Sequence, residues 1–347
     1  MKGAIITGAK KIEVRDFPMP EPDGKNVIMK VQTCGICGSD IHIWERGDQP
    51  DSYGVRPGHE HAGVVFDPGS RTDLKVGDRI TSLPKNTPCG VCTACMEHRY
   101  DDCTNRIKGI GCYSDGPAGT YAEYFITAPQ LVRKIPDTMT NEEAAMVEPC
   151  ATPYSAVKDM GIRRGDKVLV FGGGIIGSFA AQWSKYFGAD YVAMVEVNDF
   201  RGKKNLEVGN IDELFDGRDP ELLGKLIKAS GGKGFDYVLE CTGAAQPLNM
   251  AMMASKMYAR IAIIGISAEP ILFNNIVALF KRARLQAYFT YSDAEFDEVL
   301  RLIAEKKFDV LRYHSGDCSL DEIEKSFEYL HSPECEKIKI MIQFPRD

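Results

Sequence analysis

The sequence predicts an α/β protein with two domains, one doubly wound and nucleotide-binding, the other β-rich. The chain has 347 residues, enough for roughly two domains of ordinary size. Before about residue 152, short strand-like segments are separated by Gly and Pro, a texture typical of a barrel-like β domain. After it, continuous apolar runs alternate with helical spacing, which indicates a parallel sheet in βα units.

The β-rich region can be followed segment by segment. Alternation and β-branched residues predict strands, and Gly-rich turns separate them. Three prolines between residues 18 and 22 predict an extended linker, because each restricts its neighbour to extended geometry. Gly35 and Gly38 interrupt a strand, so Cys37–Trp44 is expected to begin a helical turn. The predicted strands or strand entries are 2–7, 11–15, 27–33, 58–65 and 74–80.

The second region carries the stronger α/β signal. A glycine cluster follows the first apolar run, and helical spacing then continues to Tyr186. We expect residues 153–287 to form the nucleotide domain, and residues 1–152 and 288–347 to form the other. The predicted sheet strands are 168–171, 191–195, 235–240 and 259–266; a β-like segment at 286–291, a helix near 319–330 and a strand at 339–344 follow.

Charge and cysteine usage narrow the class of partner. The net charge of -7 argues against nucleic acid and an anionic membrane surface, since both demand basic patches. The first apolar run is too short for a secretory signal, and no window reaches the length of a membrane span. Eleven cysteines in a chain of this kind are more often metal ligands than disulfides. We therefore expect a cytoplasmic protein that acts on a small molecule.

Four cysteines in one segment give the strongest single signal. Four thiolates at such close spacing can complete a tetrahedron, which suits a structural zinc ion, whereas an iron–sulfur cluster is the alternative for thiolates alone. The remaining cysteines, and His61 and His98, are interpreted as ordinary core or loop residues. The four are Cys89, Cys92, Cys95 and Cys103.

The glycine cluster predicts a dinucleotide site. Its glycines permit a tight turn, close approach to a pyrophosphate and close packing of a helix on a strand. The next apolar run ends in Glu196, whose carboxylate can accept hydrogen bonds from ribose hydroxyls and would repel a 2′-phosphate. NAD is therefore favoured over NADP, although Arg201 lies just after it. The residues expected at the cofactor are Gly172, Gly174, Ile175, Ile176, Gly177, Glu196 and Arg201.

A second group of metal-capable residues lies in the β-rich region. Cys37, His59 and Glu60 are a thiolate, an imidazole and a carboxylate, and three protein ligands with an open position describe a catalytic zinc site. Glu148 is a further candidate, either as a ligand or as the group that holds a zinc-bound water. Ser39 and His42 lie beside Cys37 and can carry a proton from the site to solvent.

Together these motifs resemble the zinc-dependent medium-chain alcohol dehydrogenase family over essentially the whole chain. Within it, Ser39–Glu45 with Glu60 and Glu148 looks most like the sorbitol (polyol) dehydrogenase branch, with threonine and butanediol dehydrogenases as close relatives. The resemblance implies a GroES-like catalytic domain, a Rossmann domain, two zinc ions and a homodimer or homotetramer.

The resemblance also implies roles for particular residues. Cys37, His59 and Glu60 would be zinc ligands, Ser39 would take the substrate proton, and His42 would pass it on. Thr242, Gly265 and Ile266, which follow later strands, would border the nicotinamide ribose.

The chain departs from the polyol pattern at two places. It has Ile43 where sorbitol dehydrogenases carry Tyr, and Thr290-Tyr291 where they carry Arg-Tyr, so the alcohol stays open. Trp44, Phe289 and Tyr291 suggest an aromatic-lined substrate pocket, with core packing as the alternative. Two other classes remain to be weighed: a metal-free reductase of activated double bonds, and a non-enzymatic zinc or redox-sensing module.

Overall fold

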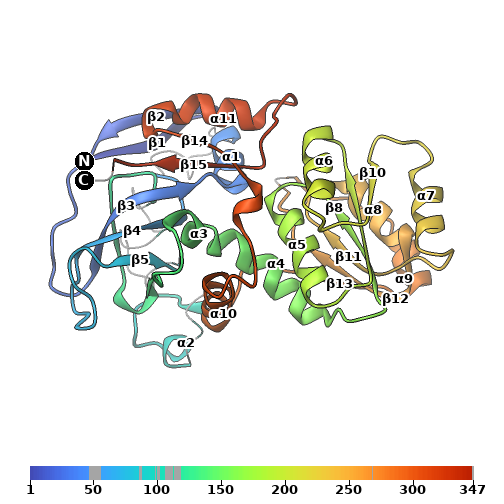
Figure 1. The fold of residues 1–347 in the computed structure, drawn as a ribbon, viewed down its shortest axis with the longest axis horizontal. Helices are drawn as coiled ribbons and strands as arrows, with labels where there is room; N and C mark the ends of the chain where they lie inside the picture. The colour runs from blue at the N-terminus through green and yellow to red at the C-terminus, as the bar shows by residue number, and fades with distance from the viewer. Residues whose placement is uncertain are drawn as a thin grey trace. The chain divides into compact units, whose positions relative to one another are not determined.

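A computed structural model describes residues 1–46, 56–85, 88–97, 99, 102–105, 112, 119–267 and 269–345. The chain divides into two compact units (Figure 1), described here separately. Unit 1 comprises Met1–Glu148, Leu300–Cys335 and Lys339–Asp347, and unit 2 comprises Pro149–Val299 and Glu336–Ile338. Within the described ranges, no helix has the length and apolar character needed to cross a membrane.

Unit 1 is built on a mostly antiparallel sheet of seven strands. Its order is β14-β15-β3-β4-β5-β7, and β6 pairs with β3 beside that path. The long central strand β3 lies next to β4. Most of β3 and the first half of β4 are buried, as their apolar and β-branched residues favour. The strands are β3 (Val27–Gly35), β4 (Glu60–Asp67), β5 (Arg79–Ser82), β6 (Tyr124–Thr127), β7 (Val132–Lys134), β14 (His314–Cys318) and β15 (Lys339–Gln343).

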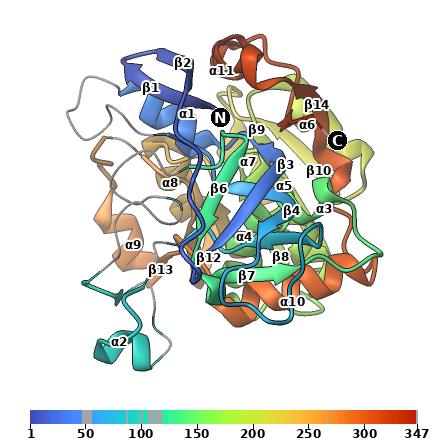
Figure 2. The same cartoon turned by 90° about the vertical axis from the view of Figure 1, so that its left-hand side faces the viewer.

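A hairpin and several short helices surround this sheet. The hairpin strands β1 (Lys2–Gly8) and β2 (Lys11–Asp16) are antiparallel, and Figure 2 shows them at the same end of unit 1 as α1 and α11. The apolar core includes Trp44, Tyr121, Phe125 and Phe327. The helical segments of unit 1 are α1 (Gly38–Glu45), α2 (Thr93–Met96), η3 (Pro129–Leu131), α3 (Asn141–Ala145), η4 (Leu311–Tyr313), η5 (Leu320–Glu322) and α11 (Ile323–His331); α4 (Val147–Met160) and α10 (Asp293–Ala304) cross the division between the units.

Unit 2 is a six-stranded parallel sheet with helices on both faces. The strand order is β10-β9-β8-β11-β12-β13, so the chain moves outward from β8 in one direction and then in the other. Figure 1 shows α5 and α6 on one face and α7, α8 and α9 on the other. The strands are β8 (Lys167–Phe171), β9 (Tyr191–Glu196), β10 (Glu213–Asp216), β11 (Phe235–Glu240), β12 (Ser255–Ile263) and β13 (Arg284–Ala287). The helices are α5 (Ile175–Tyr186), α6 (Asp199–Glu207), α7 (Leu222–Ala229), α8 (Ala245–Ala254) and α9 (Asn275–Lys281).

The α/β class with a doubly wound domain and a β-rich domain is confirmed. Some bounds differ from those expected. The strand expected at 259–266 runs from Ser255 to Ile263, so Gly265 lies beyond its carboxyl end. Of the β-like segment expected at 286–291, only the first two residues belong to a strand. The boundaries between the units lie at 148/149 and 299/300, and residues 336–338 also belong to unit 2. The sequence predicted the domain boundaries at 152/153 and 287/288.

Candidate metal centres and nucleotide loop

Cys37, His59 and Glu60 come together in unit 1. One ligand atom from each lies within 4.8 Å of the other two. The antiparallel register explains the meeting, because Gly35 at the end of β3 pairs with Glu60 at the start of β4, and Cys37 follows two residues later at the N-cap of α1. A Cβ atom at Gly35 would lie 2.0 Å from the Glu60 carboxylate, so any larger residue would displace that side chain from Lys339. The three predicted ligands therefore form one site.

Asp40 supports this site, a role the sequence did not suggest. Its Oδ1 lies 3.6 Å from His59 Nδ1, while Tyr121 donates a hydrogen bond of 2.6 Å to Oδ2. Burial opposes ionisation of the Asp40 carboxyl, but the facing His59 ring and the hydrogen bonds from Tyr121 and Gly58 outweigh burial and lower its pKa. A carboxylate at Nδ1 leaves Nε2 of His59 for a metal, as in many histidine–metal sites. In the sequence, Asp40 reads only as an acidic residue in the first turn of a helix.

Glu60 also has a partner that the sequence did not reveal. Lys339, at the start of β15, donates to both carboxylate oxygens at 2.6 and 2.8 Å and to the Ile36 carbonyl at 2.9 Å. Both side chains of the pair are 0% exposed. Burial disfavours the ammonium, but Glu60 outweighs it and raises the pKa of Lys339. The available signal was a lysine at the start of an apolar strand, because a charged residue that becomes buried is almost always paired.

The other residues predicted around Cys37 lie at different depths. Ser39 is half-buried and donates a hydrogen bond of 3.2 Å to the Cys37 sulfur. His42 is exposed, and its Nδ1 lies 3.3 Å from Glu45 Oε2. Glu148 is half-buried, and among the described residues it does not belong to the cluster of Cys37, His59 and Glu60. Its negative charge nevertheless contributes to the raised pKa of Lys339.

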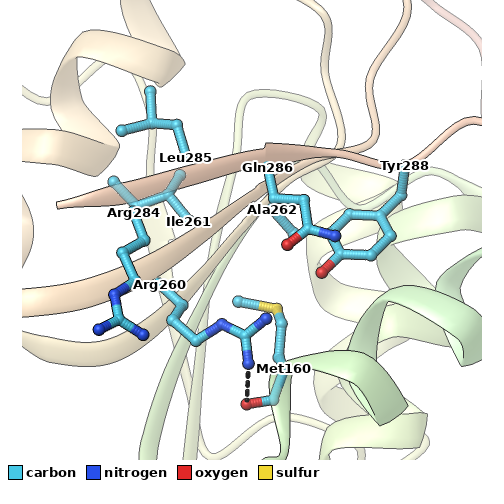
Figure 3. Close-up of a pocket in the computed structure, with 8 residues that line it drawn as sticks. All are labelled: Met160, Arg260, Ile261, Ala262, Arg284, Leu285, Gln286 and Tyr288. Atoms are coloured by element: carbon cyan, nitrogen blue, oxygen red, sulfur yellow. Dashed lines mark hydrogen bonds between the residues drawn. The ribbon is translucent and has the colours of Figure 1, made fainter.

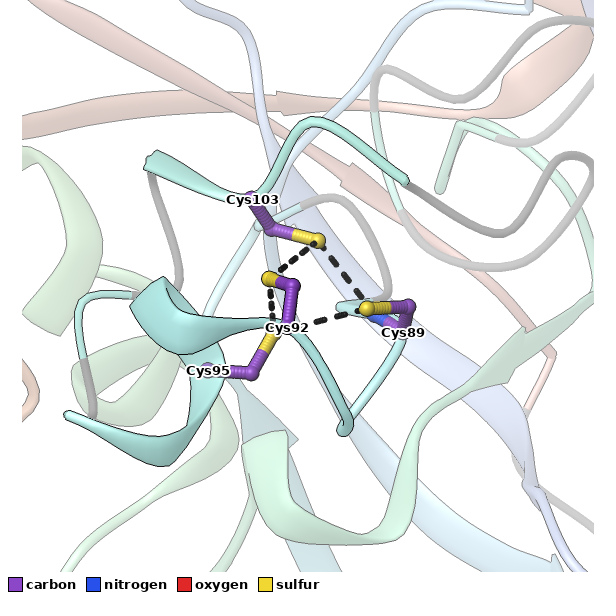
Figure 4. Close-up of side chains that lie close together, drawn as sticks. All are labelled: Cys89, Cys92, Cys95 and Cys103. Carbon is purple, nitrogen blue, oxygen red and sulfur yellow. Dashed lines mark hydrogen bonds between the residues drawn. The ribbon is translucent and has the colours of Figure 1, made fainter.

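Cys89, Cys92, Cys95 and Cys103 form a second cluster (Figure 4). The segment of residues 89–103 is called the lobe from here on. The sulfurs of the cluster are separated by 3.5 Å (Cys92 to Cys95) and 3.9 Å (Cys89 to Cys95, and Cys92 to Cys103). A zinc–sulfur bond of about 2.3 Å in a tetrahedron places the sulfurs roughly 3.8 Å apart, so the spacing fits one zinc ion. N–H groups of Val91 and Cys92 lower the pKa of Cys89 to about 6, while burial raises that of Cys95 to about 12. All eleven cysteines lie among the described residues, and none of them forms a disulfide.

The glycine cluster of unit 2 joins β8 to α5, as the motif predicts. Gly172 has a φ of 94°, and a Cβ atom on Gly177 would lie 1.8 Å from the Gly172 carbonyl, so both positions require glycine. Glu196 ends β9 and accepts hydrogen bonds from the N–H groups of Gly173, Val197 and Asn198. The loop and the acidic residue therefore lie side by side at the carboxyl ends of adjacent strands.

The remaining predicted cofactor residues flank this edge of the sheet. Ile175 and Ile176 begin α5, and Arg201 donates from Nε to the Lys337 carbonyl at 3.3 Å. Thr242 follows β11, where its N–H bonds the carboxylate of Glu240, a fully buried residue that the sequence did not single out. A Cβ on Gly265 would lie 2.0 Å from the Gly243 nitrogen, so the two loops touch; Ile266 beside them is exposed.

The three aromatic residues predicted for a substrate pocket have unlike surroundings. Trp44 is buried and packs edge-on against Phe327. Tyr291 is buried and stacks on Phe296, whereas Phe289 is exposed. A pocket of about 250 Å³ on unit 2 (Figure 3) contains none of the three. Its lining is Met160, Arg260, Ile261, Ala262, Arg284, Leu285, Gln286 and Tyr288.

The same features occur in proteins of known class. Residues 23–137 match the alcohol dehydrogenase GroES-like domain, and residues 176–305 match the zinc-binding dehydrogenase domain. The sorbitol dehydrogenase of Halalkalibacterium halodurans is 32% identical over 97% of this chain and 98% of that protein. D-xylulose reductase A of Aspergillus oryzae is 28% identical over 93% of this chain and 91% of that protein. The structure of 2R,3R-butanediol dehydrogenase from Bacillus subtilis has a TM-score of 0.84 and 27% identity, with 99% of both chains covered.

The chain therefore belongs to the zinc-dependent medium-chain alcohol dehydrogenase family. It is an oxidoreductase that acts on a small-molecule alcohol, with zinc and a nicotinamide dinucleotide as cofactors. Membership sets aside the metal-free reductase and the non-enzymatic zinc module, and zinc rather than an iron–sulfur cluster is the metal of the family.

Proposed function

We propose that the protein transfers hydride between a secondary alcohol of polyol type and NAD. The observation that carries the proposal is the cluster of Cys37, His59 and Glu60. Three protein ligands of different chemistry leave a fourth position for substrate, whereas the four thiols of the lobe close their own tetrahedron. The first cluster is thus proposed as the catalytic zinc site and the lobe as the structural one.

The bound cofactors supply polarisation of the alcohol oxygen by zinc and a hydride acceptor in NAD. The chain supplies the proton path. The Ser39 hydroxyl, 3.2 Å from the Cys37 sulfur, stands beside the metal position and takes the substrate proton. His42 lies one turn further along the same face of α1, so it receives the proton and releases it to water.

Two acidic residues have supporting roles in the proposal. Asp40 orients His59 through Nδ1. Glu148 ligates zinc or holds its water, which its electrostatic effect on both Lys339 and the buried Cys112 supports.

The polyol assignment draws on the relatives named sorbitol dehydrogenase and D-xylulose reductase. Ile43 weakens the case for sorbitol itself, because its side chain packs on the apolar core of unit 1 and offers no hydrogen bond. A vicinal diol, or an amino alcohol such as threonine, is the second candidate, favoured by Ile43 and by the likeness to butanediol dehydrogenase. Of the three aromatic residues, Phe289 stays a proposed contact of the substrate, whereas the packing of the buried Trp44 and Tyr291 against Phe327 and Phe296 favours the core-packing alternative for those two.

The nucleotide is proposed to bind at Gly172, Gly174 and Gly177, with Glu196 at the adenosine ribose. Three N–H groups fix the Glu196 carboxylate in place, which supports a preference for NAD. The flanking residues complete the proposed site, namely Ile175, Ile176, Arg201, Thr242, Gly265 and Ile266.

We further propose a homodimer or homotetramer in the cytoplasm. Large apolar side chains of α9 and the segment before it are exposed, with Leu272, Leu279 and Phe280 between 71% and 87% exposed. A second copy of the chain would remove these side chains from water. A reducing compartment would keep the eleven cysteines from forming disulfides.

The test is NAD⁺ reduction by the zinc-loaded protein against sorbitol, xylitol, 2,3-butanediol, threonine and 2-hydroxy acids. Turnover of a polyol at least tenfold faster than of the others supports the assignment, and preference for butanediol or threonine replaces it with the second candidate. Full turnover by protein stripped of zinc would contradict the proposed mechanism.

A further inference from the structure

A chain of polar side chains continues beyond His42 toward the C-terminal helix of unit 1. His42 Nδ1 lies 3.3 Å from one oxygen of Glu45, and the other oxygen lies 3.1 Å from His331 Nδ1. His331 Nε2 in turn lies 3.5 Å from the Lys10 ammonium. The four residues come from α1, the end of α11 and the turn between β1 and β2, so only the fold brings them together.

The network assigns a tautomer to each ring. An ammonium can only donate, so Nε2 of His331 accepts from Lys10 and its Nδ1 carries the hydrogen donated to Glu45. A carboxylate can only accept, so Nδ1 of His42 also carries its hydrogen. The lone pair of His42 is then at Nε2, which makes Nε2 the atom able to take up a proton.

Packing around the network fixes its members relative to one another. The Lys10 N–H donates a hydrogen bond of 2.7 Å to the Trp44 carbonyl. The buried Trp44 ring meets both Phe327 and His331 edge-on, at centroid distances of 5.8 and 5.9 Å. Trp44 thereby holds the end of α11 against the end of α1, which places His331 within reach of Glu45.

These ion pairs contribute little to stability. The side chains of His42, Glu45 and His331 are 46%, 30% and 39% exposed, and exposed pairs typically contribute under about 1 kcal/mol. Their removal should therefore leave the fold intact and expose any chemical role.

We propose that Glu45 is a positioning residue for the alcohol oxidation, and that His331 holds Glu45. Glu45 keeps His42 in the tautomer whose Nε2 can accept the proton that Ser39 passes on. This rests on the proposed role of His42. In each turnover Ser39 would pass the alcohol proton to Nε2, from which it leaves to water, and bound NAD⁺ would accept the hydride from the same alcohol carbon, so charge and atoms balance. The charged groups around His42 and Glu45 in this network are Lys10, His331 and the neighbouring Arg46.

The first measurement is the nitrogen chemical shifts of His42 in protein labelled with ¹⁵N-histidine, with the six histidines assigned by substitution. For the neutral ring of the native protein, we expect the pattern of the tautomer that carries its hydrogen on Nδ1. Glu45→Gln should shift the balance toward the other tautomer, because an amide can donate to Nδ1. An unchanged His42 spectrum in Glu45→Gln would overturn the proposal without any substrate.

The second measurement is kcat against pH for the zinc-loaded protein with NAD⁺ and 2,3-butanediol. Glu45→Gln should lower kcat at pH 7 by about tenfold or more, since positioned proton transfer contributes roughly 10²–10⁴-fold. The loss should shrink above pH 9, where hydroxide can take the proton, and KM for NAD⁺ should stay within about twofold. His331→Leu should show a smaller loss of the same form, and His331→Asn, which keeps a donor, should recover part of it.

Two further variants separate the possible failures. Glu13→Gln removes an exposed carboxylate paired with Arg15 and should change nothing. If His42→Ala keeps native kcat at pH 7, the proposed role of His42 fails. If His42→Ala loses activity and Glu45→Gln does not, only the positioning role of Glu45 fails. A loss in Glu45→Gln that is equal at every pH would also overturn the positioning role of Glu45.

Discussion

The two candidate metal centres of unit 1 are built in opposite ways. The lobe takes four identical ligands from one short segment, Cys89 to Cys103, and its sulfurs are already at tetrahedral spacing. The other centre takes three unlike ligands from the ends of β3 and β4, and two charged residues, Asp40 and Lys339, hold them in the interior. A closed, local site suits a structural ion, whereas an open site supported by the fold suits chemistry.

The largest effect is expected when the centre formed by Cys37, His59 and Glu60 loses a ligand. Cys37→Ala should lower kcat by roughly 1,000-fold or more, because Lewis-acid stabilisation is worth several kcal/mol. Metal analysis should find one zinc per chain in place of two, with NAD binding retained. Cys150→Ala, which removes a buried thiol outside both clusters, is the matched control. Native activity in Cys37→Ala would show that the chemistry takes place elsewhere.

The second effect concerns the buried pair that supports the open centre. Lys339→Met leaves the Glu60 carboxylate without its buried counter-charge, which should cost about 3–5 kcal/mol in the zinc-free protein. Urea unfolding measures the loss, and the double variant Lys339→Met, Glu60→Met should recover most of it because no charge then remains buried. A loss below about 1 kcal/mol in the single variant would mean that water reaches the site.

The lobe should respond locally. Cys95→Ser should remove one zinc and open the segment to protease, since a structural zinc ion supplies much of the folding energy of its own loop. Turnover per folded molecule should fall by less than about tenfold, because the open centre keeps its ligands. Cys318→Ser, which changes a thiol outside the lobe, should resist protease as the native protein does. If Cys95→Ser lost all activity when it lost the zinc ion of the lobe, the two centres would not be independent.

The last effect is expected in unit 2, where the nucleotide loop, like the four-cysteine lobe, is formed by one short segment. Glu196→Ala should raise KM for NAD⁺ about tenfold, or about 1.4 kcal/mol, and improve use of NADP⁺. Initial rates with both nucleotides measure the change, and Glu207→Ala at the carboxyl-terminal end of α6 serves as the control. An unaltered ratio of NAD⁺ to NADP⁺ use would assign the preference to Arg201 or other residues.

The sequence by itself determined the features that depend on spacing along the chain. Four thiols within one segment can reach a single ion whatever the rest of the fold does, and Gly172 to Gly177 specify their turn through backbone geometry alone. The alternation of apolar runs with helices likewise predicted the parallel sheet, because strands that are covered by helices on both faces consist of continuous apolar residues.

Only the tertiary structure decided the partners of the candidate site residues. Lys339 lies far along the chain from Glu60, and strand register alone makes them neighbours. Asp40 reads as a helix-capping acid until Tyr121 and His59 are seen to face it, and His331 reaches Glu45 because Trp44 packs two helices together. Long-range pairing is invisible in spacing, since it depends on how strands align and side chains pack, and in this protein it is pairing of that kind that supports the open metal centre.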